Sequence, residues 1–220
     1  MKRIFAGICG IIVGLFISGC GCSIIEPGHV GIKVNNLGSE RGVQNYAAQT
    51  GLVFYMPGLS SIFEYPTYVQ TAKWTKHDES GEGDSINEEV SFNTKEGTVV
   101  SGDISLAFRL DPPKVPHFYV QFRSDDLSIF THGFLRNIAR DAFNEEGCKY
   151  TLEEIYGPKK EELITNVKKR INSQVSQYGV IMEQFGFLGK IRMDEKIMAA
   201  LNAKLTTTQN AIAAENRLRE

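Results

Sequence analysis

The chain has 220 residues, enough for one ordinary domain with extensions or for two small domains. Its 24 lysines and arginines nearly balance its 26 aspartates and glutamates, and the formal net charge is -2. This balance does not suit a nucleic-acid-binding protein, which needs a basic surface. The spacing of the four cysteines (Cys9, Cys20, Cys22 and Cys148) does not suit a disulfide framework or a zinc cluster.

The N-terminus carries the pattern of an export or insertion signal. Lys2 and Arg3 precede residues 4–17, a run of 14 residues without a charge. The positive-inside rule keeps the two cations in the cytoplasm. We therefore expect the chain after Glu26 to lie on the other side of the membrane, which is the periplasm in a Gram-negative cell.

Two kinds of anchor fit this segment. Ile17-Ser18-Gly19-Cys20 resembles the lipobox of bacterial lipoproteins, in which the cysteine thiol receives the lipid and becomes the mature N-terminus. Alternatively, the uncharged run continues to Ile25, and a helix over residues 4–25 would span roughly 33 Å, enough to cross a hydrocarbon core of about 30 Å. Both alternatives predict a signal or membrane anchor within residues 1–25.

Residues 26–111 have the pattern of short strands. Val30, Ile32 and Val34 alternate on one face of the first. Further strands are predicted over 51–58, 62–66 and 68–76, and over 90–93 and 98–110, a hairpin with Gly97 in its turn. In the last strand the apolar positions are Ile104, Leu106, Phe108 and Leu110.

Residues 114–178 have helical spacing. Ser124 is a candidate N-cap, and Gly147 is placed to end the helix that follows. Thr151 and Glu154 fit a capping box before a short helix. A further helix, starting at Gly157-Pro158, extends to Tyr178.

The chain then returns to a strand and ends in a long helix. Over 180–193, Ile181, Phe185, Phe187 and Ile191 occupy odd positions, which predicts a last strand. The order of strands, helices and a final strand predicts an α+β domain over 26–193, an antiparallel sheet packed with helices. Residues 194–220 contain no glycine or proline, which favours one helix.

The final helix has an imperfect coiled-coil seam. Its apolar members are Ile197, Leu201, Leu205 and Ile212, and polar residues occupy two further positions. A helix that merely packs on its own domain is the alternative. We expect the seam to join copies of the chain into an oligomer.

No pattern typical of catalysis is found. The four histidines are scattered, and the sequence contains no HExxH, CxxC or phosphate-binding loop. We therefore expect neither an enzyme nor a bound cofactor or metal ion.

Four further segments, taken in order, suggest a family: Glu26-Pro27-Gly28-His29-Val30-Gly31, Gly51-Leu52-Val53-Phe54-Tyr55-Met56-Pro57-Gly58, the strand from Glu96 to Ile104, and Ala213-Ala214-Glu215-Asn216-Arg217. Together with the N-terminal segment, they resemble the SPFH or Band 7 superfamily (stomatin, prohibitin, flotillin, HflK/C) over the chain after Glu26. The resemblance implies a membrane-anchored scaffold that assembles into rings or cages, organises membrane microdomains and modulates membrane proteases or channels. It implies no catalytic residue.

Two features depart from the family pattern. A lipid on Cys20 would replace the membrane helix, and the coiled coil is shorter than in prohibitins. A smaller ring, or a mixed assembly with a longer paralogue, fits the shorter helix. The alternative function is a monomeric envelope lipoprotein that acts as an adaptor or chaperone-like regulator of an envelope protease.

Overall fold

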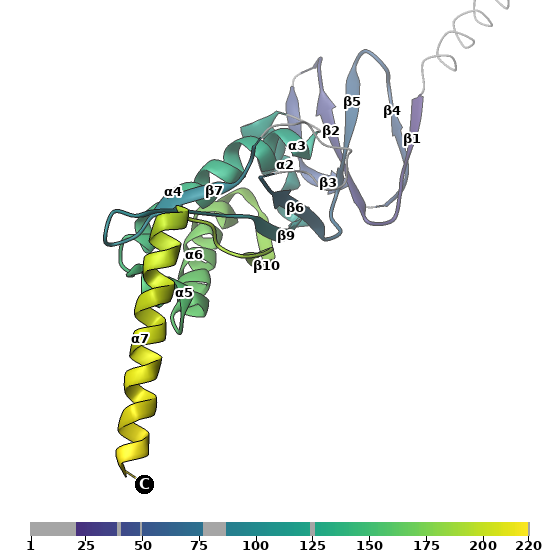
Figure 1. Cartoon of the computed structure of the whole chain (residues 1–220). Helices are drawn as coiled ribbons and strands as arrows, with labels where there is room; N and C mark the ends of the chain where they lie inside the picture. Colours follow the sequence, from purple (N-terminus) through teal and green to yellow (C-terminus); the bar gives the residue numbers. More distant parts are fainter. Residues whose placement is uncertain (1–20, 39–40, 49, 77–86, 124–125, 220) are drawn as a thin grey trace, which may run out of the picture. The chain divides into compact units, whose positions relative to one another are not determined.

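The computed structural model describes residues 21–38, 41–48, 50–76, 87–123 and 126–219 (Figure 1). The chain divides into two compact units. The first unit contains the chain up to Gln70, Ala107–Gly133 and Asn172–Glu183. The second unit contains Thr71–Leu106, Phe134–Ile171 and the chain from Gln184 onward.

Strands and helices alternate along the described residues in blocks. The strands are β1 (Gly21–Ile25), β2 (His29–Asn35), β3 (Gly42–Ala48), β4 (Gly51–Tyr55), β5 (Ser60–Pro66), β6 (Gln70–Trp74), β7 (Val90–Asn93), β8 (Val99–Gly102), β9 (Ile104–Leu110) and β10 (Val180–Phe187). The helices are α2 (Val115–Phe122), α3 (Leu127–Ile129), α4 (Arg136–Gly147), α5 (Leu152–Tyr156), α6 (Lys160–Val175) and α7 (Glu195–Arg219). The short 3-10 helices η1 (Pro112–Lys114) and η3 (Ser176–Tyr178) and the π-helix η2 (Phe130–Leu135) connect some of them.

The first unit contains a three-stranded antiparallel sheet of order β3-β2-β5 and a two-stranded ribbon of β1 and β4. Val30 and Ile32 are buried, as the alternation in β2 predicts. Ile25, the last residue of β1, is also buried, and a Cβ atom at Gly31 would collide with its side chain. The bare backbone of β2 at Gly31 therefore lets Ile25 pack across it, which connects the ribbon to the sheet.

Aromatic side chains pack α2 against this sheet. The ring centroids of Phe63 and Tyr119 lie 4.9 Å apart, and those of Tyr65 and Phe118 lie 5.9 Å apart in an edge-to-face arrangement. Phe118 also contacts Phe130, with 5.0 Å between ring centroids. Such pairs contribute beyond the area they bury, so this cluster forms much of the core of the first unit.

In the second unit, the β7–β8 hairpin packs on α4. Phe92 of β7 stacks on Phe143 of α4, with ring centroids 5.1 Å apart. Thr151 and Glu154 form the predicted capping box at the start of α5. On α6, the buried positions Leu163, Val167 and Ile171 recur at intervals of four, which is the spacing of one helix face.

A second three-stranded sheet has the order β10-β9-β6, and the unit boundary falls within each of these strands. Ile104, Leu106, Phe108 and Leu110 of β9 are buried, as predicted. The α+β class, with antiparallel sheets and helices, is confirmed.

The predicted strand over 98–110 is in fact two strands. β8 ends at Gly102 and pairs with β7, whereas β9 begins at Ile104 and belongs to the other sheet. Asp103 lies between them, and its carboxylate accepts hydrogen bonds from the backbone of Lys76 and from the side chain of Arg192. At the break, the side chain of Asp103 thus adds hydrogen bonds to Lys76 and Arg192, and its backbone carbonyl accepts from the backbone of Leu188 at 2.8 Å.

Other local predictions need correction. Residues 21–25, which one reading of the sequence placed in a membrane helix, form β1. The N-cap before α3 is Asp126, whose carboxylate accepts a hydrogen bond from the Ser128 backbone, and the predicted candidate Ser124 lies outside the described residues. In β10 the buried residues are Val180 and Met182, so the odd-position pattern fails at the start of that strand.

The expected anchor lies largely outside the described residues. These exclude residues 1–20, and thus the lipidation candidate Cys20. Within the described part of the chain, no helix is both long enough and apolar enough to cross a bilayer.

Candidate functional site at the base of the C-terminal helix

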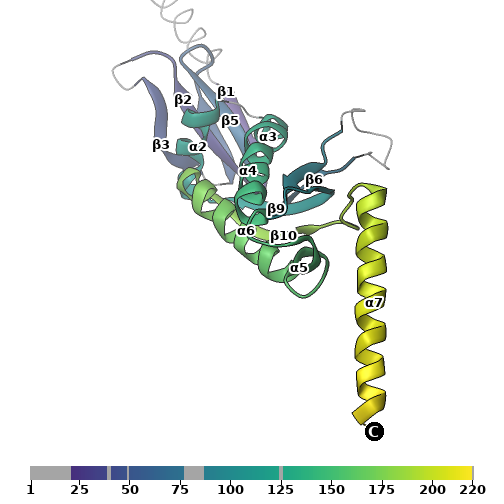
Figure 2. The same cartoon turned by 60° about the vertical axis from the view of Figure 1, so that its left-hand side comes forward.

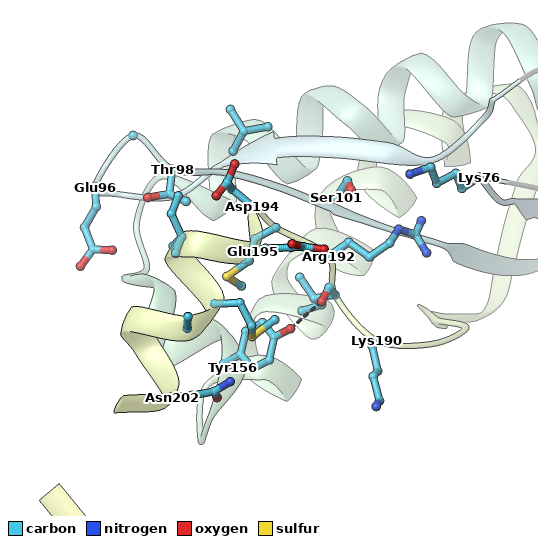
Figure 3. Close-up of a pocket in the computed structure, with 17 residues that line it drawn as sticks. Lys76, Glu96, Thr98, Ser101, Tyr156, Lys190, Arg192, Asp194, Glu195 and Asn202 are labelled. Atoms are coloured by element: carbon cyan, nitrogen blue, oxygen red, sulfur yellow. Dashed lines mark hydrogen bonds between the residues drawn. The ribbon is translucent and has the colours of Figure 1, made fainter. Parts of the chain in front are cut away.

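A hollow of about 1040 Å³ opens in the second unit beside the start of α7 (Figure 3). The β7–β8 hairpin, α5 and the segment that leads from β10 into α7 provide its walls. Much of the lining is apolar: Val99, Ile191, Met193, Ile197 and Met198. Charged side chains, including Arg192, lie among these residues.

Arg192 is held by two carboxylates from distant parts of the sequence. Its Nη1 donates to Oδ2 of Asp103 at 2.7 Å, and its Nη2 donates to Oδ1 at 2.5 Å. Its Nε and Nη2 donate to Oε2 of Glu89 at 3.2 and 2.9 Å. Because the guanidinium already donates four hydrogen bonds to two carboxylates, it stabilises the fold and is not available to bind an anionic ligand.

The charges in this cluster stabilise one another. The hydrogen bond to Asp103 is the main reason that the pKa of Arg192 is raised, and the same bond holds the pKa of Asp103 below its usual value. Burial acts to raise the pKa of Glu89, but hydrogen bonds from Asn87, Arg192 and Ser101 outweigh it, so that this pKa is also lowered. All three groups therefore stay ionised at neutral pH.

Backbone and hydroxyl contacts fix the same segment. Ser101 and Arg192 exchange two backbone hydrogen bonds, of 2.8 and 2.7 Å. The hydroxyl of Tyr156, on α5, donates to the carbonyl of Ile191 at 2.5 Å, which Figure 3 marks with a dashed line. Asp194 caps the following helix, since its Oδ1 accepts from the backbone of Lys196 at 2.9 Å. The start of α7 is thus held to β8, to α5 and to its own cap.

Beyond this base, α7 leaves the body of the second unit. Leu201 is buried, and Lys204 forms an ion pair with Glu153 of α5. Every later α7 side chain that the structure describes is exposed. Figure 2 shows the helix extending away from α5 and α6.

The structure divides the four residues predicted for the oligomerisation seam. Ile197 lines the hollow and Leu201 is buried, so both pack within the second unit. Leu205 and Ile212 are exposed, with 41% and 54% of their surface accessible. These two remain candidates for contact with another chain, whereas the first two belong to the base of the helix.

The site offers binding surface more than reactive chemistry. In the part of the chain that the structure describes, no group of three or more His, Cys, Asp or Glu side chains could hold a metal ion. Arg192 is paired with Asp103 and Glu89, while Lys76, Glu96, Lys190, Asp194 and Glu195 place further charges around the apolar part of the lining. The main structural role of the site is to fix where α7 leaves the second unit.

Sequence reasoning singled out neither Arg192 nor its partners. Asp103 and Arg192 are 89 residues apart, and Glu89 and Arg192 are 103 apart, so no local spacing connects them. One weak signal exists at Asp103, a charged residue that immediately precedes the apolar alternation of β9.

A family model agrees with this architecture. The model described as SPFH domain / Band 7 family matches residues 23–220, nearly the whole chain. The protein belongs to the SPFH domain / Band 7 family.

Membership in the SPFH / Band 7 family indicates a function only at the level of the family. It supports a scaffold of the prohibitin and stomatin type, and the members typically form oligomers and associate with membranes. The match begins within β1 and covers all of β4. No curated protein matches the chain.

Proposed function

We propose that the chain is a membrane-anchored subunit of an oligomeric scaffold, which organises membrane microdomains and modulates a membrane protease or channel, and which has no catalytic activity of its own. Residues 1–20 provide the anchor, as a lipid on Cys20 or as a membrane helix, and the described domain lies on the non-cytoplasmic side. The observation that carries the proposal is the exposed part of α7 beyond Leu201.

An exposed helix of this kind needs a partner. Helices gain most of their stability in proteins from packing, and short isolated ones are marginal in water. Thr206, Thr207 and Thr208 lower the intrinsic helix propensity further, and their hydroxyls donate to carbonyls four residues earlier. Contact with a second helix would offset this weakness.

The exposed apolar residues have the spacing that such contact requires. Leu205 and Ile212 are seven residues apart, one heptad, and therefore lie on the same side of α7. The hydrogen bonds and the ion pair at the base of α7 hold the helix in a fixed direction relative to the second unit, so that this side stays exposed. An anchor that confines copies to one membrane plane raises their effective concentration, so a seam this short can suffice for assembly.

The test is the size of the full-length protein extracted in mild detergents, measured by blue-native electrophoresis and mass photometry. We expect a discrete oligomer for the natural sequence. The double variant Leu205→Glu/Ile212→Glu should shift it to smaller species, because charges on the seam repel one another.

A matched control keeps the number of added charges equal. Thr207→Glu/Ala214→Glu places two glutamates about 200° around the helix from the seam, at exposed positions. This variant should assemble like the natural sequence. A natural chain that is monomeric in every mild detergent would instead favour the monomeric lipoprotein adaptor, and mass spectrometry of the mature N-terminus would identify lipid on Cys20.

A further inference from the structure

One edge of β8 faces the hollow at the base of α7. In an antiparallel pair, residues alternate between bonding to the partner strand and directing their backbone groups away from it. The backbone N–H of Thr94 donates to the carbonyl of Thr98 at 2.9 Å, so Thr98 bonds towards the β7 side of the hairpin. Val99, the next residue and the first of β8, therefore directs its N–H and carbonyl away from β7.

A second contact shows the same alternation. Ser101, two residues after Val99, exchanges its backbone hydrogen bonds with Arg192, so both residues present their backbone groups at the same edge of β8. If the segment after Arg192 continued as a strand, Asp194 would lie opposite Val99. Asp194 instead caps α7, and among the backbone hydrogen bonds of the described residues none joins it to Val99.

The hollow lies where these two segments part. Val99 and Asp194 both line it, and the side chain of Val99 is 61% exposed. A strand edge with its N–H and carbonyl available is a template for pairing with another chain. The complement of that donor and acceptor is a second peptide backbone, whereas a hydrocarbon chain offers neither group.

The charges of the lining differ between the two ends of β8. Glu96 lies just before the strand, and Asp194 approaches its first residue, so this end is acidic. Lys76 lies at the other end, where its backbone donates to Asp103, the residue after β8. Figure 3 shows Glu96 and Lys76 on opposite sides of the hollow. A segment that occupies the acidic end is therefore favoured when it carries a positive charge.

We propose that the hollow binds an extended segment of a partner protein, which pairs with β8 at Val99 and carries a basic residue beside its apolar ones. In this mode of recognition, main-chain hydrogen bonds provide affinity and contacts of the side chains provide specificity. The basic side chain lies towards Glu96. The apolar side chains contact the apolar lining residues Ile191, Met193, Ile197 and Met198. This binding requires neither the anchor nor the assembly of subunits.

Val99→Pro removes the donor at this edge selectively. Proline lacks the backbone N–H, and an edge strand tolerates it where that N–H points away from the neighbouring strand. The hydrogen bonds between β7 and β8 therefore stay in place. Val99→Ala, which shortens the side chain but keeps the N–H, is the matched control, and circular dichroism measures whether both variants are folded.

The probe is a fluorescein-labelled peptide in which a short run of valines is flanked by lysines. Its binding to the full-length protein in a nonionic detergent is measured by fluorescence anisotropy, with protein-free micelles as the background. We expect Val99→Pro to weaken binding about fivefold, the effect of one lost hydrogen bond, and Val99→Ala to change it less. A peptide flanked by glutamates should bind more weakly to the natural chain.

Methylated peptides test the pairing without any change in the protein. Methyl groups on the amide nitrogens of alternate valines block one edge of the probe, and the two possible sets block opposite edges. One set should bind the natural chain about fivefold more weakly than the other. Equal binding of the two sets, equal binding by natural and folded Val99→Pro protein, or no binding of the lysine-flanked probe at millimolar concentration would overturn the inference.

The same probe separates this inference from the proposed assembly. Leu205→Glu/Ile212→Glu changes α7 beyond the hollow and should bind the lysine-flanked peptide as the natural chain does. A natural chain that is monomeric and still binds the probe would refute the assembly and leave the peptide site standing. An oligomer for which Val99→Pro makes no difference would refute the peptide site alone.

Discussion

Arg192 binds Asp103 through two parallel hydrogen bonds, and this pair connects the junction between β8 and β9 to the segment that leads into α7. A planar guanidinium can contact both carboxylate oxygens at once, whereas the ammonium of a lysine acts as a point charge. Glu89 accepts two more hydrogen bonds from the same side chain. One residue therefore gathers three separate segments of the second unit.

Removing this side chain should weaken the second unit. We expect Arg192→Met to lower the free energy of unfolding by about 1–2 kcal/mol, because two carboxylates lose their partner. We expect a smaller loss than for a fully buried ion pair, because the side chain of Arg192 is 34% exposed and solvent screens its attraction to Asp103. Thermal unfolding of the full chain in detergent, followed by circular dichroism, measures the change.

Two comparison variants give this result its meaning. Arg192→Lys keeps the charge but not the paired geometry, so it should recover only part of the loss. Lys169→Met removes an exposed cation of α6, and its effect should remain within about 0.5 kcal/mol. An Arg192→Met protein as stable as the natural one would show that the cluster contributes nothing.

The same cluster predicts a loss of stability in acid. The pKa of Asp103 is lowered mainly by its hydrogen bond with Arg192. A carboxyl group whose pKa is lower in the folded than in the unfolded state stabilises the fold above the unfolded value, near 4, and this stabilisation is lost as the pH falls through the folded pKa. We therefore expect the Tm to fall progressively as the pH drops below about 4.

Replacing the carboxylate should flatten this dependence. Asp103→Asn removes the titrating group, so its Tm should fall less steeply over the same interval than that of the natural chain. Asp141→Asn, at an exposed position of α4, should keep the natural slope. Parallel profiles for the two variants would mean that Asp103 is not a source of the acid sensitivity.

Local patterns were sufficient for many elements of this fold. The alternation in β2 and β9, the capping box at Thr151 and the end of α4 at Gly147 all follow from interactions within a few residues. The long C-terminal helix follows from composition. In each case neighbouring residues determine the conformation.

Features that depend on distant contacts could not be read in this way. A short apolar run fits a helix or a strand equally well, and β1 is a strand because it pairs with β4. The segment Gly42–Ala48 carries strand formers only at Val43 and Tyr46 and was not predicted as a strand, yet it forms β3 beside β2. Along the chain, Arg192 lies 89 residues after Asp103 and 103 residues after Glu89, so no short stretch of sequence contains the cluster.

Gly147 should tolerate no larger residue. A Cβ atom there would lie 2.6 Å from Cδ2 of Phe92 and 2.9 Å from the backbone oxygen of Asn93. Alanine normally stabilises a helix by up to about 1 kcal/mol relative to glycine, but here we expect Gly147→Ala to cost about 1–3 kcal/mol through overpacking. Chemical unfolding of the full chain in detergent gives the sign directly.

The control for that substitution is Gly133→Ala in η2. Apart from its chain neighbours and the backbone of its own helix, no atom lies within 4 Å of the position that its Cβ would occupy. This variant should be as stable as the natural chain or slightly more stable. If Gly147→Ala also proved stabilising, the close contact of α4 with β7 would be refuted.

The hydroxyl of Tyr156 should control the local stability of the first turns of α7. It donates to the carbonyl of Ile191 at 2.5 Å, and burial raises the pKa of the phenol, so that it remains a donor over the working pH range. We expect Tyr156→Phe to cost about 1 kcal/mol, the contribution of one neutral hydrogen bond. The loss should be concentrated in the segment that this bond holds.

Hydrogen exchange measured by mass spectrometry separates that local effect from general destabilisation. Peptides covering residues 191–201 should exchange several-fold faster in Tyr156→Phe, whereas peptides from α4 should change little. Tyr68→Phe, at an exposed tyrosine of the first unit, should leave both unchanged. Unaltered exchange at residues 191–201 would show that the ion cluster and the Asp194 cap suffice to hold α7. Faster exchange there, combined with weaker assembly in detergent, would connect the base of the helix to its proposed role in joining subunits.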